Sequence, residues 1–189
     1  MKMNKNISKS YVIETKRFKL RIPSLEDIPY VFSATRFEGF NDGMMWEAPE
    51  NEKELSEPLR KNIKSWELGT SYSFTIENKH STALLGRIVI IQTKEKNVWS
   101  LGFWTHPESQ GQGIMTEAIN GVLKFGFETL LAIRIEAFHA IWNKASEKVL
   151  KKNGMKFVRY VEKGFKKNGK WVDENLLAIS KEEWGLLRL

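Results

Sequence analysis

The chain has 189 residues, no cysteine and a formal net charge of +7 at pH 7. This is the length of one domain with a substantial core, and the lack of cysteine excludes a disulfide framework, a thiol nucleophile and a thiolate metal site. Residues 1–10, expected to form a flexible N-terminal arm, lack the apolar segment of a signal peptide. No apolar run is long enough to span a bilayer, so a cytoplasmic protein without a membrane partner is expected.

The basic excess has two interpretations. A positive surface favours nucleic-acid binding, but the lysines and arginines are spread along the chain among acidic residues. That distribution is typical of a solvated surface. Nucleic acid is therefore not expected as a partner, and a basic nucleic-acid-binding domain is kept as an alternative. The three histidines have no metal-ligand spacing, and no metal site is predicted.

The N-terminal part of the chain predicts a strand and two helices. In residues 11–22 apolar and charged side chains alternate, which indicates a strand. Ser24, followed by two acidic residues, predicts the N-cap of a helix that continues to about Ala34. A second helix is predicted for residues 51–68, with Pro58 marking a kink or a restart.

The middle of the chain changes to a period of two. Residues 72–76, 83–92 and 98–105 are joined by short polar turns and predict an antiparallel meander. The long apolar run within the second of these strands indicates a central position in the sheet. The remaining predicted elements are a helix at residues 113–128, a strand at 130–141, a helix from Asn143 to Gly154 and a hairpin of residues 155–166 and 170–180 that turns at Asn168-Gly169. One α+β domain spanning residues 1–189 is predicted.

The stretch from residue 102 to residue 119 passes from a strand through a polar loop with two glycines into a helix. The first turn of a helix has amides without intrahelical partners and carries partial positive charge. A strand, a glycine-bearing turn and a helix therefore direct free N–H groups at one spot, and the best-matched ligand is a phosphate or diphosphate. A Walker loop is absent, and a dinucleotide fingerprint is excluded because no third glycine follows Gly111 and Gly113.

Three motifs resemble the GNAT family of N-acetyltransferases. Gln110-Gly-Gln-Gly113-Ile-Met115 resembles the family's acetyl-CoA diphosphate loop, Arg/Gln-x-x-Gly-x-Gly/Ala, with Met115 departing at the last small position. Asn143-x-x-Ser146, followed by Gly154-Met, resembles the segment after the fifth strand of the family. Gly169-Lys-Trp-Val-Asp173 resembles the last hairpin of the ribosomal-protein N-terminal acetyltransferase branch, the RimJ/RimL-like enzymes. Together the matches run from residue 16 to residue 184.

The resemblance implies a fold and an activity. The expected fold is a mixed, mostly antiparallel sheet of about seven strands flanked by about four helices. The expected activity is direct transfer of acetyl from acetyl-CoA to a primary amine, with CoA as product. The acceptor would be a protein or peptide N-terminal amine, with ribosomal proteins among the candidate partners, or a small-molecule amine. The alternative is a CoA-binding regulatory or interaction module without turnover, which Met115 and Ser100 suggest because relatives often carry a glutamate where Ser100 stands.

The resemblance also implies roles for particular residues. Ser146 would protonate or hydrogen-bond the departing thiolate, with Asn143 beside it, although Asn143 is equally a candidate helix N-cap. Trp46, Glu47 and Asp173 are candidates for the acceptor pocket. The general base is open between Glu47, His106, Glu136 and Asp173. The expected cofactor-binding residues are Phe103, Trp104, Thr105, Gln110, Gly111, Gln112, Gly113, Ile114, Met115, Thr116, Asn143 and Ser146.

Overall fold

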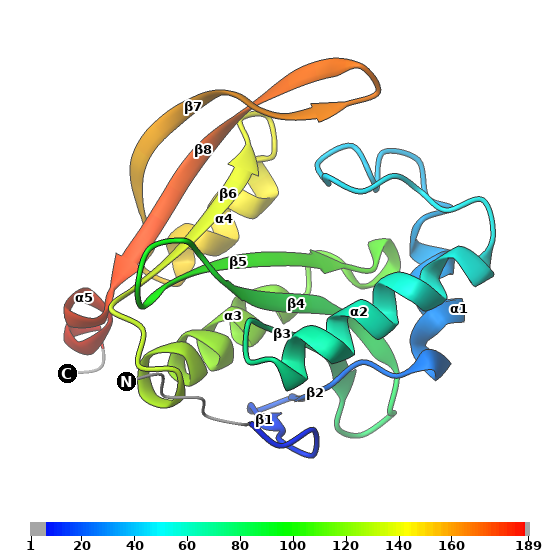
Figure 1. Ribbon diagram of the computed structural model, residues 1–189, viewed down its shortest axis with the longest axis horizontal. Helices are drawn as coiled ribbons and strands as arrows, with labels where there is room; N and C mark the ends of the chain where they lie inside the picture. The colour runs from blue at the N-terminus through cyan, green and yellow to red at the C-terminus, as the bar shows by residue number, and fades with distance from the viewer. Residues whose placement is uncertain (1–6, 188–189) are drawn as a thin grey trace.

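An eight-stranded sheet with the order β1-β2-β3-β4-β5-β6-β8-β7 runs through the molecule (Figure 1). The computed structural model describes residues 7–187. Neighbouring strands pair antiparallel, except that β5 and β6 are parallel. The strands are β1 Ile13–Glu14, β2 Phe18–Arg21, β3 Ser71–Asn78, β4 Leu84–Gln92, β5 Val98–Thr105, β6 Arg134–Ala140, β7 Lys156–Lys167 and β8 Lys170–Ser180.

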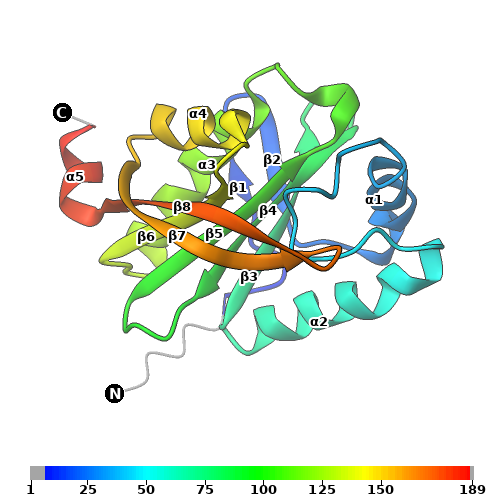
Figure 2. The ribbon, with the colours of Figure 1, turned by 90° about the horizontal axis from the view of Figure 1, so that it is seen from above.

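Five α-helices surround the sheet in residues 7–187. Seen from above, α3 and α4 lie on one side of the strands, and α1 and α2 lie on the other (Figure 2). The helices are α1 Ile28–Ala34, α2 Ser56–Glu67, α3 Ile114–Lys124, α4 Lys144–Lys152 and α5 Lys181–Leu186. The predicted α+β class with a mixed, mostly antiparallel sheet is confirmed, with eight strands and five helices where about seven and about four were expected.

The main core lies between the sheet and α3. Ile119 and Val122 of α3 are fully buried, and Phe74 and Ile90 are fully buried on the strands of the same core cluster. The apolar residues of α3 recur at helical spacing, so one stripe of the helix faces the sheet. This packing fixes the position of the N-terminus of α3, where the glycine loop enters.

A buried ionic cluster holds the start of α1 against the sheet. Asp27 is 1% exposed and accepts hydrogen bonds from Arg21 Nη2 at 2.9 Å and from Thr75 Oγ1 at 2.7 Å. A buried carboxylate needs such partners because burial removes its hydration. The side chain of Asp27 also caps the backbone N–H of Ser24, which completes a capping box.

Several predicted elements differ from the structure, among them the strand expected at residues 130–141, which begins only at Arg134. The expected strand at residues 11–22 is two short strands, because Thr15 Oγ1 accepts the backbone N–H of Phe18 at 3.0 Å and closes a turn. The second helix restarts, with a 3₁₀ turn at Glu52–Leu55 before α2. The third ends as a π turn at Phe125–Thr129. Helix α5 was not predicted, although Ser180 and Glu183 form a capping box at its start.

The first residues that the structure describes are packed against the domain. Trp66 Nε1 donates to the backbone oxygen of Ile7 at 2.9 Å, and Lys9 forms an ion pair with Glu67 at 2.8 Å. Residues 7–10 of the expected flexible arm are therefore anchored to α2, and residues 1–6 lie outside the described part. Within residues 7–187, no helix is long and apolar enough to cross a membrane.

Candidate active site

The parallel strands β5 and β6 separate half-way along their length. Their pairing covers Val98–Leu101 against Arg134–Ala137. Beyond Leu101, β5 continues to Thr105 paired only with β4, and β6 continues to Ala140 paired only with β8. The second half of β5 therefore has one edge without a strand neighbour, and the sheet opens into a gap at this point.

The hydrogen-bond alternation shows which amides face that gap. His106 N donates to Leu85 O at 3.0 Å, and Thr93 N donates to Val98 O at 3.0 Å. Because pairing residues in an antiparallel ladder alternate, the even-numbered residues of β5 bond to β4. The N–H groups of Phe103 and Thr105 point into the gap. Trp104 directs its amide at β4 and contributes its ring, which lies 5.4 Å from the ring of Phe40.

The glycine loop presents a run of free amides at the N-terminus of α3. Gly111 and Gly113 have φ of +77° and +72°, in the left-handed region that glycine enters without strain. In the part of the chain that the structure describes, no acceptor is recorded for the backbone N–H groups of residues 111–116. Gln110 differs, because its amide donates to Pro107 O at 3.3 Å. Six consecutive free amides therefore surround the start of the helix.

Met115 does not obstruct this loop. Its side chain is 5% exposed and belongs to the core cluster beneath α3. The Met115 side chain, which replaces the small residue of the family pattern, therefore points into the protein, while the Met115 amide stays among the free N–H groups.

Asn143 and Ser146 lie together at the start of α4. Asn143 Oδ1 accepts the backbone N–H of Ser146 at 3.0 Å, so Asn143 is the N-cap of the helix. The amide nitrogen Nδ2 of Asn143 lies 3.3 Å from the position that a Cβ of Gly43 would occupy. The loop between α1 and α2 therefore reaches across the gap and contacts the cap. Among the described residues, the hydroxyl of Ser146 has no recorded hydrogen-bond partner.

The same loop is fastened to the tip of the β7–β8 hairpin. Lys167 Nζ donates to Trp46 O at 2.8 Å and to Glu47 Oε2 at 2.7 Å. The Lys167 side chain is 7% exposed, and a buried ammonium requires such partners. Figure 1 shows the loop and the hairpin tip reaching towards each other on one side of the molecule. Trp46 and Glu47 thus form a bridge over the gap, and Glu47 is committed to Lys167.

Asp173 is also committed to structural partners. Its carboxylate accepts the backbone N–H of Lys163 at 2.8 Å and the hydroxyl of Tyr160. The hydrogen bond from the Lys163 backbone, followed by that from Tyr160, lowers the pKa of Asp173 below its ordinary value. The same contact with Asp173 raises the pKa of Tyr160 to about 12. A carboxylate held in this way is a weak proton acceptor.

The two other candidate bases have partners as well. His106 is 4% exposed; its Nε2 lies 3.1 Å from Ser33 Oγ, and its Nδ1 accepts the backbone N–H of Glu108 at 3.3 Å. Burial lowers the pKa of His106, so the ring is neutral. Glu136 lies opposite Ser100 in the parallel pairing, and its Oε2 is 3.5 Å from Arg134 Nη2. The four acids and bases of the sequence-based prediction all have hydrogen-bond or ionic partners.

Glu174 is a carboxylate that sequence reasoning missed. It pairs with Ala140 in the register of β6 and β8, which places it on the same face of the sheet as Ser100 and Trp104. The side chain is partly buried, and burial raises the pKa of Glu174. In residues 7–187 its carboxylate has no recorded hydrogen bond or ion pair. No spacing in the sequence indicated this residue, because its environment comes from strand pairing.

Arg17 is the second residue that the sequence-based prediction missed. It donates from its backbone and from Nε to the carboxylate of Glu117, both at 2.7 Å, and from Nη1 to Gln112 O at 3.0 Å. Glu117 stands in the first turn of α3, where sequence reasoning placed an acid favourable to the helix dipole. The N-terminal segment before β2 thus holds the glycine loop in place.

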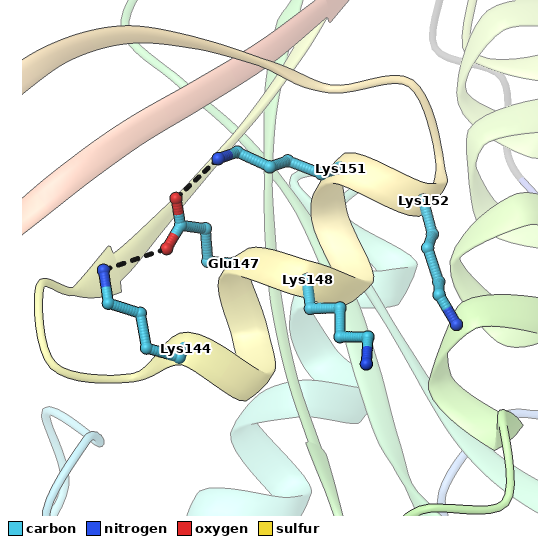
Figure 3. Close-up of a pocket in the computed structure, with 5 residues that line it drawn as sticks. All are labelled: Lys144, Glu147, Lys148, Lys151 and Lys152. Carbon is cyan, nitrogen blue, oxygen red and sulfur yellow. Dashed lines mark hydrogen bonds and ion pairs between the residues drawn. The ribbon is translucent and has the colours of Figure 1, made fainter.

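A shallow hollow on α4 has a different character. It has a volume of about 440 Å³ and is lined by Lys144, Glu147, Lys148, Lys151 and Lys152 (Figure 3). Hydrogen bonds from Lys151 and then Lys144 lower the pKa of Glu147 to about 2. All five lining residues belong to α4, and the hollow includes neither the free amides of residues 111–116 nor the gap between β5 and β6. The hollow is therefore a solvated basic surface.

The site thus combines a splayed parallel strand pair, β5 and β6, with free amides at the head of α3, the helix that follows β5. A family model described as "Acetyltransferase (GNAT) domain" matches residues 17–156. The chain therefore belongs to this family and, by family, is an acetyl-CoA-dependent acetyltransferase domain.

Three known proteins illustrate the relationship. The "Uncharacterized N-acetyltransferase YnaD" of Bacillus subtilis (strain 168) is 31% identical over 111 residues, which cover 59% of this chain and 65% of that protein. RimL, a ribosomal alpha-N-protein acetyltransferase crystallised with coenzyme A, superposes with a TM-score of 0.82 at 17% identity over 90% of this chain and 98% of its own. The microcin C7 self-immunity acetyltransferase MccE, in complex with acetyl-CoA and AMP, gives 0.83 at 19% identity over 93% and 98%. The structural matches show the fold.

Proposed function

We propose that this protein is an N-acetyltransferase that moves an acetyl group from acetyl-CoA directly to a primary amine. The observation that carries the proposal is the run of six free amides at residues 111–116 beside the open edge of β5. A helix N-terminus with unpaired N–H groups binds a diphosphate. The pantetheine arm then lies along β5, where the amides of Phe103 and Thr105 hold it and polarise the thioester carbonyl.

The transfer needs no protein nucleophile. The amine nitrogen attacks the carbonyl carbon, the carbonyl oxygen takes up negative charge, and the carbon–sulfur bond then breaks. The departing thiolate takes a proton from Ser146, whose hydroxyl lies at the head of α4 and regains a proton from water. The attacking nitrogen loses a proton to a base, because the product amide is neutral. Each bond formed or broken is therefore accounted for without a cysteine.

Glu174 is the base in this proposal. It shares a sheet face with Trp104, whose ring packs with the loop that bridges the gap. Its raised pKa suits a group that must accept a proton near neutral pH, and it has no recorded partner in the described chain. Glu47, His106, Glu136 and Asp173 are each engaged by other groups.

For the acceptor, we propose an N-terminal amine of a protein or peptide. RimL, which shares the fold, is named as an acetyltransferase of ribosomal protein N-termini. The hairpin that carries the motif of that branch forms one wall of the gap through Lys167. A small-molecule amine is the second candidate, because MccE has the same fold and was crystallised with AMP.

The test is thiol release from acetyl-CoA with a matched acceptor panel. Each peptide is supplied with a free N-terminus and with a blocked one, beside a set of small primary amines. Thiol release only with free N-termini supports the proposal, and release only with small amines supports the second candidate. Tight CoA binding without release across the whole panel would instead identify a CoA-binding module.

A further inference from the structure

Arg17 and Glu117 form a fixed pair at the mouth of the glycine loop. One carboxylate receives both the backbone N–H and Nε of Arg17, at 2.7 Å each, although the two residues are 100 positions apart. Two bonds to one carboxylate restrict the rotation of the arginine side chain. The guanidinium plane is therefore set by the protein before any ligand arrives.

The remaining N–H groups of Arg17 face the loop. Nη1 donates to Gln112 O at 3.0 Å, and Nη2 lies 3.6 Å from the position that a Cβ of Gly113 would occupy. Within residues 7–187 no acceptor is recorded for Nη2. Gly113 is the N-cap of α3, so this end of the guanidinium lies beside the first free amides of the helix.

The pair also removes an electrostatic conflict. Burial of the Glu117 carboxyl opposes its ionisation, but hydrogen bonds from the backbone and side chain of Arg17 outweigh that effect and lower its pKa. An unpaired carboxylate in the first turn would repel a diphosphate arriving at the same helix end. With Arg17 in place the local charge is balanced, and free guanidinium N–H groups remain.

We propose that Arg17 is a ligand of the CoA diphosphate, with Nη2 donating to a diphosphate oxygen while Nε and the backbone hold Glu117. The inference rests on the proposed use of acetyl-CoA. A charged donor fixed beside the amides adds a hydrogen bond stronger than those of the amides alone. The glycine loop is thus completed by a residue from the other end of the chain.

The experiment measures dissociation constants by calorimetry for CoA, dephospho-CoA and pantetheine, the last by competition at millimolar concentration. Arg17→Gln should weaken CoA and dephospho-CoA by the same factor, about 10- to 100-fold, and leave pantetheine unchanged, because only the first two contain a diphosphate. Arg17→Lys, which keeps the charge but loses the fork, should fall between the wild type and Arg17→Gln.

Lys16→Gln is the matched control, because Lys16 is an exposed neighbour and its replacement removes the same charge. Equal losses of CoA affinity in Lys16→Gln and Arg17→Gln would overturn the inference in favour of non-specific electrostatic attraction by the positive charges of this region. Glu117→Gln breaks the same side-chain pair but keeps the guanidinium, so an equal loss of CoA affinity in Glu117→Gln and Arg17→Gln would overturn the inference in favour of a purely structural role, with melting temperatures as a check on folding. If the wild type binds none of the three, the proposed function itself fails.

Discussion

The two sides of the strand gap are built from different kinds of chain segment. On the proposed cofactor side, the six free amides of residues 111–116 come from one continuous stretch, and two glycines with positive φ shape it. On the acceptor side, the bridge joins Trp46 and Glu47 to Lys167, about 120 positions away in the sequence. Local backbone geometry therefore makes one half of the site, and side-chain contacts between distant segments make the other. We therefore expect the first half to tolerate little change in the loop, and we expect changes in the second half to leave cofactor binding intact.

The largest expected effect is on the cofactor side. Gly113→Asp places a side chain at a φ of +72° and a negative charge beside the free amides, so CoA affinity should fall by about 100-fold or more. Calorimetry with CoA measures the loss. Gly185→Asp adds the same charge on α5 with open space around it and should leave CoA affinity unchanged. Unchanged CoA binding in the Gly113 variant would remove the loop from the site.

The next effect separates chemistry from binding. Glu174→Gln should lower kcat by about 100-fold without changing CoA affinity, because general base catalysis contributes roughly that much. In the wild type, kcat should fall as the pH drops through the Glu174 pKa, which burial raises above its ordinary value, since protonation removes the base. This acid limb should disappear in the variant. Glu162→Gln on exposed β7 is the control, and an unaltered pH profile in Glu174→Gln would exclude Glu174 as the base.

A smaller effect is expected at the acceptor bridge. Lys167→Ala removes the donor to Trp46 O and Glu47. KM for the amine should therefore rise about tenfold, which corresponds to a loss of about 1.4 kcal/mol of binding free energy. KM for acetyl-CoA should stay constant, because the glycine loop does not depend on the bridge. Steady-state kinetics at saturating concentrations of each substrate separate the two constants. Lys166→Ala, which changes the neighbouring exposed lysine, serves as the comparison. A rise in both constants would show that the two sides are coupled.

The smallest effect concerns the cap of α4, which lies between the two sides. Asn143→Ala removes the acceptor of the Ser146 backbone N–H and should lower the free energy of unfolding by about 1 kcal/mol. Denaturant titration measures this change. Asn143→Ser, which keeps a capping oxygen, should retain most of the stability. If both variants lose equal stability, the contact of Asn143 with the Gly43 loop outweighs the cap.

The order of strands and helices was predictable because each element carries its own period. The meander of β3, β4 and β5 and the hairpin turn at Asn168-Gly169, with φ of +47° and +77°, follow from alternation and turn chemistry. The split of the opening strand was missed because a hydrogen bond from the backbone N–H of Phe18 to Thr15 Oγ1 closes a turn, across which the two halves pair with each other. Helix α5 was missed although its capping box stands in the sequence. Short elements depend on contacts that a period does not reveal.

By itself the sequence determined the α+β class, the family motifs and the glycine loop, since free amides at a helix start follow from residues adjacent along the chain. Tertiary structure alone decided which acids are engaged. Within residues 7–187, strand register left the Glu174 carboxylate without a recorded hydrogen bond or ion pair, and chain folding brought Lys167 to Glu47 and Arg17 to Glu117. Hydrogen bonding and burial of a carboxylate depend on neighbours tens of residues away, so no local pattern encodes which of them is free to take a proton.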